Sequence, residues 1–580
     1  MILRSLNIGV SSLLSQQKAI DTISQNIANV NTPGYSRQTA ELVSAIPNHI
    51  AGSDFGSGVN IANIRRSLDP ILARAQIKNN SLTSLAQTLQ QGLSSVEAAF
   101  GNLDAPGLTS TLDDFFQAQQ QLANTPEDPI SRLNVQSRAQ DIALRLSGMR
   151  QQLIDSQTAF DQEITPLISK VNSLLDKIAV LNRSVQSHEA AGQLTGSAND
   201  LRDQRDAAIM ELSKLIPVQQ VETHDGGLLL QTPGGDLIVQ NDLARHLKLG
   251  AAGSGSSFGN IEFTDTGLAA HGLEQGGKLG GLVTLRDKQL TSYIQKLDSL
   301  AKNLIFSVNQ LHVGGTGAKA VTSYTAGQTA TDSNGATLAV NADAGIPFAD
   351  QIKTGAFTVH VLDTAGVPVN PPGAGGTSIT VTAGTTRLSD IATAVSAING
   401  VTASISNGKL TINGGANRVV FANDTSNFLA AYEINTFFHG GSAADFSVDN
   451  AILNDADRIA TAAADSTTSA VAPADNSIAL TILALRDKAV SIDGSTAASP
   501  VQRAATLAST YGLDIDAANQ QVSYREAEAS SLSLQRQSVS GVNVDEELVK
   551  MMQFQRAYEA AAKVIQTSNQ MLDSLLGLIR

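Results

Sequence analysis

The fold is decided by residues 544–579, which read VDEELVKMMQFQRAYEAAAKVIQTSNQMLDSLLGLI. Mostly apolar positions recur there at alternating spacings of four and three residues, which is the pattern of a coiled-coil seam. At about 1.5 Å per residue this helix would be about 55 Å long, so the stretch also predicts a second long helix packed along it. The seam positions are Val544, Leu548, Met551, Gln555, Tyr558, Ala562, Ile565, Asn569, Leu572, Leu576 and Ile579.

Two polar residues interrupt one of the two columns of this seam. Gln555 and Asn569 share a column with Leu548, whereas the column from Val544 to Ile579 is wholly apolar. Buried amides in a seam lower stability, but they can fix the register and the oligomeric state of the helices. The alternative is that both amides face a neighbouring chain or water. The sequence supports the two interpretations equally.

The first thirty residues predict the partner helix. Their apolar side chains fall on or near one helical face, although Gln17 and Ser24 interrupt that face. A turn should follow at residues 31–35, because Pro fixes a negative φ and Gly supplies the positive φ that a type II turn needs. The apolar face is Leu6, Val10, Leu13, Ile20, Ile23, Ile27 and Val30, and the turn is Asn31, Thr32, Pro33, Gly34 and Tyr35.

Between the two ends the sequence predicts a helical bundle with β-rich insertions. A four-three pattern recurs from Phe160 to Val185, where Pro166 should kink the helix or mark a helix start. Strand-like runs flank residues 233–235 and 407–408, and both of these pairs of runs read as hairpins. The expected fold class is multidomain α+β, with long terminal helices in a coiled-coil or helical-bundle region and β-rich domains in the middle. The expected domains are a terminal coiled coil (1–35 with 543–580), a helical bundle (36–217 with 281–313 and 496–542), a small β-rich domain (218–280) and an outer β-rich insertion (314–495).

Composition excludes several classes of function. The chain has 580 residues and a net charge of -14, from 39 basic and 53 acidic residues, so we expect no nucleic-acid partner. It has no cysteine, which excludes disulfides and thiolate metal sites. Polar residues interrupt the opening apolar run before it reaches the length of a signal sequence. We therefore expect neither membrane insertion nor a cleaved signal peptide.

Short stretches that resemble catalytic or ligand-binding motifs lack the context that their chemistry needs. Residues 255–259 match the letters of a nucleophile elbow, but they lie in a Gly/Ser loop without the strand and helix that should flank them. Residues 272–278 resemble a phosphate loop, yet Leu279 stands where a hydroxyl must bind magnesium. The pair Asp203 and Asp206 is better explained by helix faces and caps. We therefore expect no catalytic, cofactor or metal site, and no enzyme.

Tracts at both ends resemble the signatures of the flagellar rod, hook and hook-associated axial proteins. Residues 26–38, NIANVNTPGYSRQ, are similar to the N-terminal signature of that family. Residues 541–547, GVNVDEE, with QRAY at 555–558 and KVIQT at 563–567, are similar to its C-terminal signature. The YSRQ that ends the first tract, the GVN of the second and NDLRDQRD at 199–206 favour the hook-associated members that join hook to filament.

The resemblance implies a structural adaptor of the bacterial flagellum that assembles through its paired terminal helices. It implies these partners: further copies of the chain in a ring or tube, the hook protein, the next hook-associated protein toward the filament, and an export chaperone that binds the C-terminal helix. It also implies an extracellular location at the hook–filament junction, reached by type III export. The residues that would assemble subunits are Leu6, Val10, Leu13, Ile20, Ile27, Val544, Leu548, Met551, Gln555, Tyr558, Ile565, Asn569, Leu572, Leu576 and Ile579.

Two other functions stay open on the sequence alone. Some axial proteins carry functional insertions, so residues 314–495 could make the chain a secreted adhesin or enzyme, although this segment has no recognisable catalytic set. A rod or hook subunit would share the same termini. The length of the chain and the DQRD tract at residues 203–206 argue against that second alternative.

Overall fold

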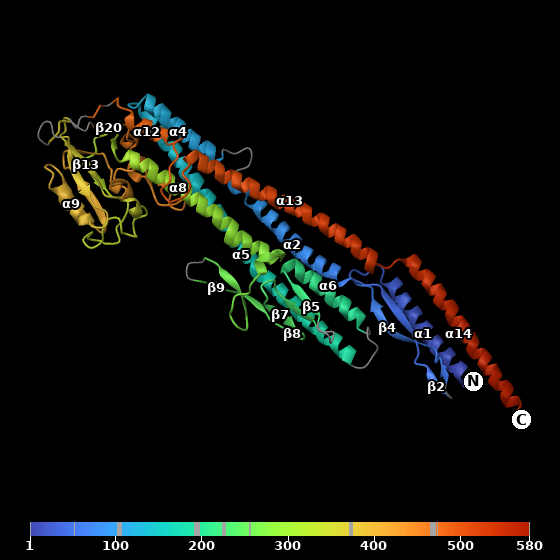
Figure 1. Cartoon of the computed structure of the whole chain (residues 1–580). Helices are drawn as coiled ribbons and strands as arrows, with labels where there is room; N and C mark the ends of the chain where they lie inside the picture. Colours follow the sequence, from blue (N-terminus) through green and yellow to red (C-terminus); the bar gives the residue numbers. More distant parts are fainter. Residues whose placement is uncertain are drawn as a thin grey trace. The chain divides into compact units, whose positions relative to one another are not determined.

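The chain folds into two compact units of helices and small antiparallel sheets (Figure 1). The computed structural model describes residues 2–50, 53–100, 107–190, 198–222, 228–253, 257–369, 375–464, 471–472 and 474–578. Unit 1 comprises Met1–Leu93, Thr158–Arg286 and Ile515–Arg580, and unit 2 comprises Ser94–Gln157 and Asp287–Asp514. The predicted multidomain α+β class is confirmed. The four-part division inferred from the sequence stays a prediction.

Unit 1 contains the two terminal helices. Its helices are α1 (Ile2–Ala28), α2 (Pro70–Ser95), α6 (Asn199–Leu215), the short η1 (Leu273–Gln275), α7 (Gly277–Thr284), α14 (Val544–Leu578) and the second parts of α5 (Pro129–Ala190) and α13 (Pro500–Ser540). Its strands are β1 (Gln38–Ser44), β2 (Asn48–Ile50), β3 (Ser53–Phe55), β4 (Val59–Arg66), β5 (Gln219–Glu222), β6 (Leu228–Gln231), β7 (Leu237–Gln240), β8 (Leu243–Ala244), β9 (Leu247–Ala252) and β10 (Gly259–Phe263).

All strand pairs of unit 1 in the described ranges are antiparallel. β1 pairs with β4 over seven residues and has a bulge between Glu41 and Leu42, while β2 pairs with β3 and β9 with β10. The remaining strands form one sheet in the order β5-β6-β7-β8. The hairpin predicted around residues 233–235 is confirmed by the pairing of β6 with β7.

Unit 2 contains the rest of the α5 and α13 helices and the strands that follow α8. Its helices are α3 (Glu97–Phe100), α4 (Leu108–Asn124), the π-helical turn η2 (Leu285–Gln289, which begins in unit 1), α8 (Leu290–His312), η3 (Ala349–Gln351), α9 (Leu388–Ser396), α10 (Phe428–Ala431), α11 (Asn450–Asn454), η4 (Ala456–Arg458) and α12 (Ser477–Ala484). Its strands are β11 (Gly315–Thr316), β12 (Ser323–Thr325), β13 (Gly355–Leu362), β14 (Thr377–Val381), β15 (Thr402–Ser406), β16 (Lys409–Asn413), β17 (Arg418–Ala422), β18 (Phe438–His439), β19 (Ser447–Val448) and β20 (Ala462–Ala463).

Two three-stranded sheets dominate this β-structure, in the orders β14-β13-β17 and β12-β16-β15. The hairpin predicted at Asn407-Gly408 is confirmed, because these two residues alone connect β15 to β16. Their φ values of 51° and 75° are both positive, as a two-residue hairpin turn of the primed type requires.

Pro166 lies inside α5, which runs without interruption from Pro129 to Ala190. The prediction that a helix starts at this proline was therefore wrong. Proline removes one backbone donor, so the carbonyl of Gln162 loses its usual helical partner. Both residues are on the exposed side of the helix, where water can satisfy that carbonyl.

The β-rich segment of unit 2 shares its core with the helices of that unit. The Oδ1 atom of Asn309 on α8 accepts hydrogen bonds from the amides of Phe437 at 3.0 Å and Phe438 at 2.9 Å. On α5, the buried Arg132 donates to the carbonyls of Ile459 and Pro126, each at 2.6 Å. These bonds satisfy polar groups that would otherwise be buried without partners, so they fix the segment to the helices.

A buried histidine at the end of α8 makes the stability of unit 2 depend on pH. The Nδ1 atom of His312 lies 2.8 Å from the carbonyl of Asn435, and its Nε2 accepts from the amide of Ala460 at 2.9 Å. The imidazole is therefore neutral, with its proton on Nδ1. Burial lowers the pKa of His312 to about 4.

We expect unit 2 to lose about 3 kcal/mol of stability as the pH falls from about 6.5 to about 4. An unfolded histidine takes up its proton near pH 6.5, whereas the folded His312 stays neutral until about pH 4, so the unfolded state binds more protons in this window. Urea unfolding followed by tyrosine fluorescence at pH 7 and pH 4.5 measures the effect. His312→Gln should reduce the pH dependence, and the exposed His188→Gln should not. If the unfolding free energy changed equally with pH in the wild-type protein and both variants, the pH dependence would not come from His312.

Candidate assembly site: the paired terminal helices and the hub beside them

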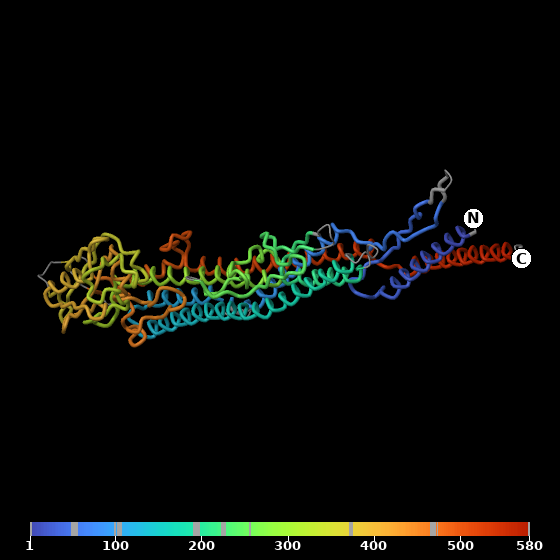
Figure 2. Tube along the Cα trace, turned by 90° about the horizontal axis from the view of Figure 1, so that it is seen from below, coloured from blue at the N-terminus to red at the C-terminus, as the bar shows by residue number. Residues whose placement is uncertain are grey.

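The two terminal helices pack against each other in antiparallel orientation, as Figures 1 and 2 both show. At one end, the Nδ2 atom of Asn26 donates to Glu547 at 2.7 Å. Toward the other end the backbones approach closely, because a Cβ atom built on Gly9 would lie 2.7 Å from Cγ1 of Ile565 and 3.5 Å from the carbonyl oxygen of Ala561. These contacts fix a register in which the last turns of α14 extend past the start of α1.

The stripe of α14 that faces α1 shares only one column with the seam read from the sequence. Glu547, Ala561 and Ser568 are buried, and partly buried residues complete an alternation of four and three residues between them. The partly buried members of this stripe are Met551, Phe554, Tyr558, Ile565 and Leu572. The middle of the predicted apolar column, from Met551 to Leu572, thus packs within the chain. The second column of the buried stripe is 547, 554, 561 and 568.

Most of the other predicted seam residues of α14 are exposed. Gln555 and Asn569 are exposed together with Val544, and Leu548 and Leu576 are 44% and 62% exposed. Ile579 lies outside the described residues. Within the chain, therefore, the two amides are not buried in a seam. Their role in setting register between subunits stays a prediction.

The α1 helix is covered on two sides and open on a third. Ala19, Ile23 and Asn26 are buried, and on the hairpin side the hydroxyl of Ser15 donates to the carbonyl of Val59 on β4 at 3.1 Å. The residues Leu6, Leu13, Ile20 and Ile27 recur every seven positions and are only partly buried. Val10 is 42% exposed.

Both terminal helices therefore carry large apolar side chains that nothing in the described chain covers. We call them the outer apolar residues: Leu3, Val10 and Leu14 on α1, and Leu548, Val564, Met571, Leu575 and Leu576 on α14. Single exposed apolar residues are common on protein surfaces, whereas a series of them along two adjacent helices makes these helices a candidate interaction surface.

The predicted turn joins α1 to the β1–β4 hairpin. Gly34 has a φ of 87°, and the amide of Tyr35 donates to the carbonyl of Thr32 at 3.2 Å. This geometry fits the type II turn expected from the sequence, with Asn31, Thr32 and Pro33 exposed.

The turn closes on a fully buried asparagine in α1. The Oδ1 atom of Asn26 accepts from the hydroxyl of Tyr35 and from the amide of Gln38, both at 2.9 Å. Its Nδ2 donates to the carbonyl of Gln38 at 2.8 Å and to Glu547 at 2.7 Å. All four hydrogen-bonding positions of the amide are used, so this side chain ties α1, the turn and α14 together.

The α6 helix holds the turn from the other side. Asp203 accepts from the amide of Ser36 at 3.0 Å and from Arg66 of β4 at 2.7 Å, and Asp206 contacts the same guanidinium at 2.8 Å. Burial raises the pKa of the Asp203 carboxyl, and the hydrogen bonds from Ser36 and Arg66 offset part of that rise. Burial, followed by the nearby Asp200 and Asp203, also raises the pKa of Tyr35.

The break between α13 and α14 lies against the same turn. The amide of Arg37 donates to the carbonyl of Ser540 at 3.1 Å, and its guanidinium lies 3.4 Å from Glu546. Gly541 is required at the break because a Cβ atom there would lie 2.2 Å from the carbonyl oxygen of Gln537. Asn543 then caps α14 by accepting from the amide of Asp545 at 3.0 Å.

We call this cluster the terminal hub: Asn26, Tyr35, Gln38, Arg66, Asp203 and Glu547. The sequence analysis assigned Asp203 to a helix face or cap, so it missed the contact of this carboxylate with Arg66. The available signal was that the tracts of the family resemblance at 26–38, 199–206 and 541–547 together contain every hub residue except Arg66.

The described residues contain neither a candidate metal-binding cluster nor a candidate membrane-spanning helix. No cluster of three or more His, Asp or Glu side chains there is arranged to hold a metal ion. Likewise, no helix in the described ranges is both long and apolar enough to cross a membrane.

Comparison with known proteins matches separate parts of the chain to flagellar families. Residues 93–327 match the model described as "Flagellar hook-associated protein FlgK helical domain". Residues 6–35 match "Flagella basal body rod protein", and residues 535–578 match "Flagellar basal body rod FlgEFG protein C-terminal".

Curated relatives cover nearly the whole chain. Flagellar hook-associated protein 1 of Salmonella typhimurium strain LT2 is 28% identical over 592 residues, which cover 99% of each chain. The Bacillus subtilis strain 168 protein of the same name is 24% identical and covers 97% of this chain and 96% of its own. The chain is thus similar over nearly its whole length to proteins named flagellar hook-associated protein 1. The resemblance read from the terminal tracts is thereby confirmed.

A solved flagellar protein shares this fold. The flagellar hook junction protein FlgK from Burkholderia pseudomallei superposes with a TM-score of 0.51 at 16% identity, over 81% of this chain and 100% of that chain. The two rod-protein models cover most of α1 and all of α14. The similarity to the rod-protein models and the terminal hub thus involve the same helices.

Proposed function

We propose that this chain is a structural adaptor of the bacterial flagellum that joins the hook to the filament and assembles through its paired terminal helices. The names of the curated relatives and of the solved hook junction protein support the location. Assembly through the terminal helices is supported by the exposure of the outer apolar residues, which is the main observation behind the proposal.

The energetic argument rests on burial of these side chains between subunits. Fully burying a Leu, Val or Met side chain contributes about 1.5–3 kcal/mol relative to leaving it exposed. The hub holds α1 and α14 in one arrangement before assembly, so less ordering has to occur when the interface forms. In a closed ring each contact repeats around the symmetry axis, so a modest gain per subunit becomes a stable assembly.

The same proposal assigns the partners. Further copies of the chain would bury the outer apolar residues in a ring or tube, with the hook protein on one side and the next hook-associated protein on the other. An export chaperone would bind the C-terminal helix before assembly, because α14 has the largest exposed apolar series in the described chain. The chain would act outside the cell, at the hook–filament junction, without a cleaved signal peptide.

Deleting the gene should leave cells with complete hooks, no filaments and filament protein in the growth medium. Electron microscopy of the cell surface and immunoblotting of the medium measure both effects, and the wild-type gene supplied on a plasmid is the control. Loss of the hooks themselves would instead indicate a rod or hook subunit. Normal filaments would contradict the adaptor and favour a function carried by residues 314–495.

A further inference from the structure

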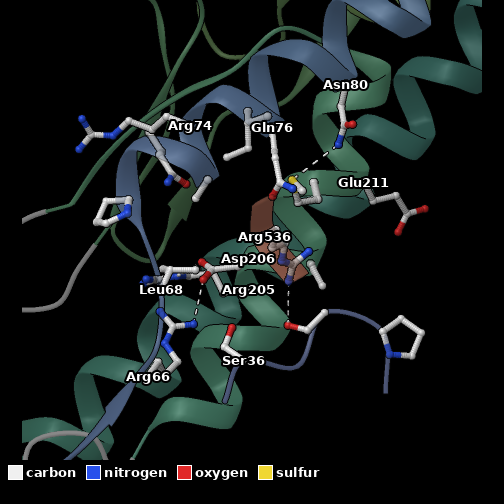
Figure 3. A pocket seen from close by; sticks show the side chains of 18 of the residues that line it. Ser36, Arg66, Leu68, Arg74, Gln76, Asn80, Arg205, Asp206, Glu211 and Arg536 are labelled. Carbon is white, nitrogen blue, oxygen red and sulfur yellow. Dashed lines mark hydrogen bonds and ion pairs between the residues drawn. The ribbon is translucent and has the colours of Figure 1, made fainter. Parts of the chain in front are cut away.

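A groove runs along α2 in unit 1, away from the outer apolar residues. It consists of two cavities of about 330 and about 460 Å³ that share Arg74, Ile77 and Gln220 in their walls. Figure 3 shows the first cavity, with Arg66, Asp206 and Arg536 gathered on one side and Arg74 extending away from them. The second cavity continues past Arg74 to Lys78.

One wall of the groove is the edge of a sheet. Five consecutive residues, 217–221, line the second cavity, as expected where the groove meets a strand at its edge and not at one face. β5 is the terminal strand of the order β5-β6-β7-β8. In the described chain its backbone bonds only to β6, so its outer N–H and C=O groups can accept another strand.

The opposite wall carries positive charge that the described chain leaves unbalanced. Arg74 and Lys78 are exposed, one helical turn apart, and neither contacts a carboxylate in the described ranges, while Lys214 and Arg536 add charge at the other end. The two acids in the walls are already occupied, Asp206 by Arg66 at 2.8 Å and Glu211 by Lys170 at 3.2 Å. This concentration of cations is notable in a chain of net charge -14.

We propose that the groove binds an extended acidic segment of a partner protein, which adds to β5 as an outer strand. Alternate residues of a strand lie about 6.8 Å apart on one side, and residues one turn apart on a helix lie about 6 Å apart along its axis. Two carboxylates at alternate positions of the segment therefore match Arg74 and Lys78. Backbone pairing with β5 supplies affinity, and the two ion pairs select acidic segments.

The test uses the full chain and a defined probe. Immobilised protein is incubated with synthetic hexapeptide libraries in which the second and fourth positions are fixed as Glu, or as Gln in the control library, and the retained peptide is measured by mass spectrometry. We expect about tenfold greater retention of the Glu library, because two partly desolvated ion pairs correspond to roughly that factor. Arg74→Glu with Lys78→Glu should abolish the difference. Lys177→Glu, an exposed helical cation elsewhere in unit 1, should preserve it.

A second arm tests the strand pairing. Methylating the backbone nitrogens of the peptides on one edge should abolish retention, and methylating those on the other edge should not. Equal retention of the Glu and Gln libraries, or tolerance of methylation on both edges, would overturn the proposal. So would a change in self-association of the Arg74→Glu/Lys78→Glu protein in sedimentation velocity without a change in peptide retention, because the groove would then contact a second copy of the chain.

Discussion

A chain carrying Leu548→Asp and Leu576→Asp should remain a folded monomer and should no longer join hook to filament. Both side chains are exposed in the described chain, at 44% and 62%, so a carboxylate at either position stays in water and leaves the monomer unaffected. In an assembled ring the same carboxylates would be buried against a neighbouring subunit. An unpaired buried charge costs several kcal/mol, and a ring repeats that cost at every interface.

The measurements are thermal unfolding of the purified chain and motility of a deletion strain that carries each variant. Lys563→Asp, an exposed change on the side of α14 away from α1, is the matched control and should swim. Ile565→Asp provides the contrast, because Ile565 packs against Gly9 and its loss should also destabilise the monomer. If the double variant swims, or unfolds as easily as Ile565→Asp, the outer apolar residues are not the assembly surface.

Asp203→Ala should destabilise unit 1 by about 3 kcal/mol. The substitution leaves the guanidinium of Arg66, whose side chain is 9% exposed, without its 2.7 Å partner, and it leaves the amide of Ser36 without an acceptor. Asp206 still contacts Arg66, so the effect belongs at the lower end of the range for a broken buried pair. Unit 1 would then no longer hold the turn between α1 and the β1–β4 hairpin.

The adjacent exposed pair Arg65–Glu41, at 3.2 Å, supplies the control for this prediction. Glu41→Ala should change stability by less than about 1 kcal/mol, because solvent screens an exposed pair. Amide exchange measured by mass spectrometry resolves the two units, and Asp203→Ala should lower the protection of α6 by roughly a hundredfold. Protection of α6 equal to that in Glu41→Ala would show that the hub does not depend on Asp203.

The sequence predicted the elements well wherever a local pattern determines them. The helices at both termini, the two hairpins and the turn at Gly34 follow from periodicity and from residues that tolerate positive φ. One of the two alternatives predicted for Pro166, a helix start, was wrong because the effect of a proline depends on exposure. On the exposed side of a long helix, water can replace the one hydrogen bond that a proline removes, so the helix tolerates the proline. The local sequence pattern does not show whether that position is exposed or buried.

The seam of α14 shows a subtler limit. Apolarity alone favoured the column of Leu548 and Leu576 over the column of Glu547 and Ser568, yet the second column faces α1. Small residues such as Ala561 and Gly9 let the two backbones approach closely, and Glu547 finds a partner in Asn26. Close approach and polar pairing depend on the partner helix. The sequence of α14 alone therefore could not show which of its columns faces α1.

The terminal hub could not be predicted from the sequence for the same reason. Arg66, Asp203 and Glu547 are each ordinary charged residues in their local sequence, and only the fold brings them to one place. The tracts of the family resemblance contained two of these three residues, but a resemblance does not state which side chains touch.

The bond between Asn26 and Glu547 joins residues 521 positions apart, which gives the chain an order of events. During synthesis α1 emerges long before α14, so the inner side of α1 stays without its partner helix until α14 has been made. Because closing a loop becomes only slightly harder with length, about 0.6 kcal/mol for each doubling, this late contact remains accessible. A chain cut short anywhere before α14 cannot complete the hub, and it therefore cannot present the paired helices to another subunit. Under the proposed function, this connection between the two helices would limit incorporation to chains synthesised through α14.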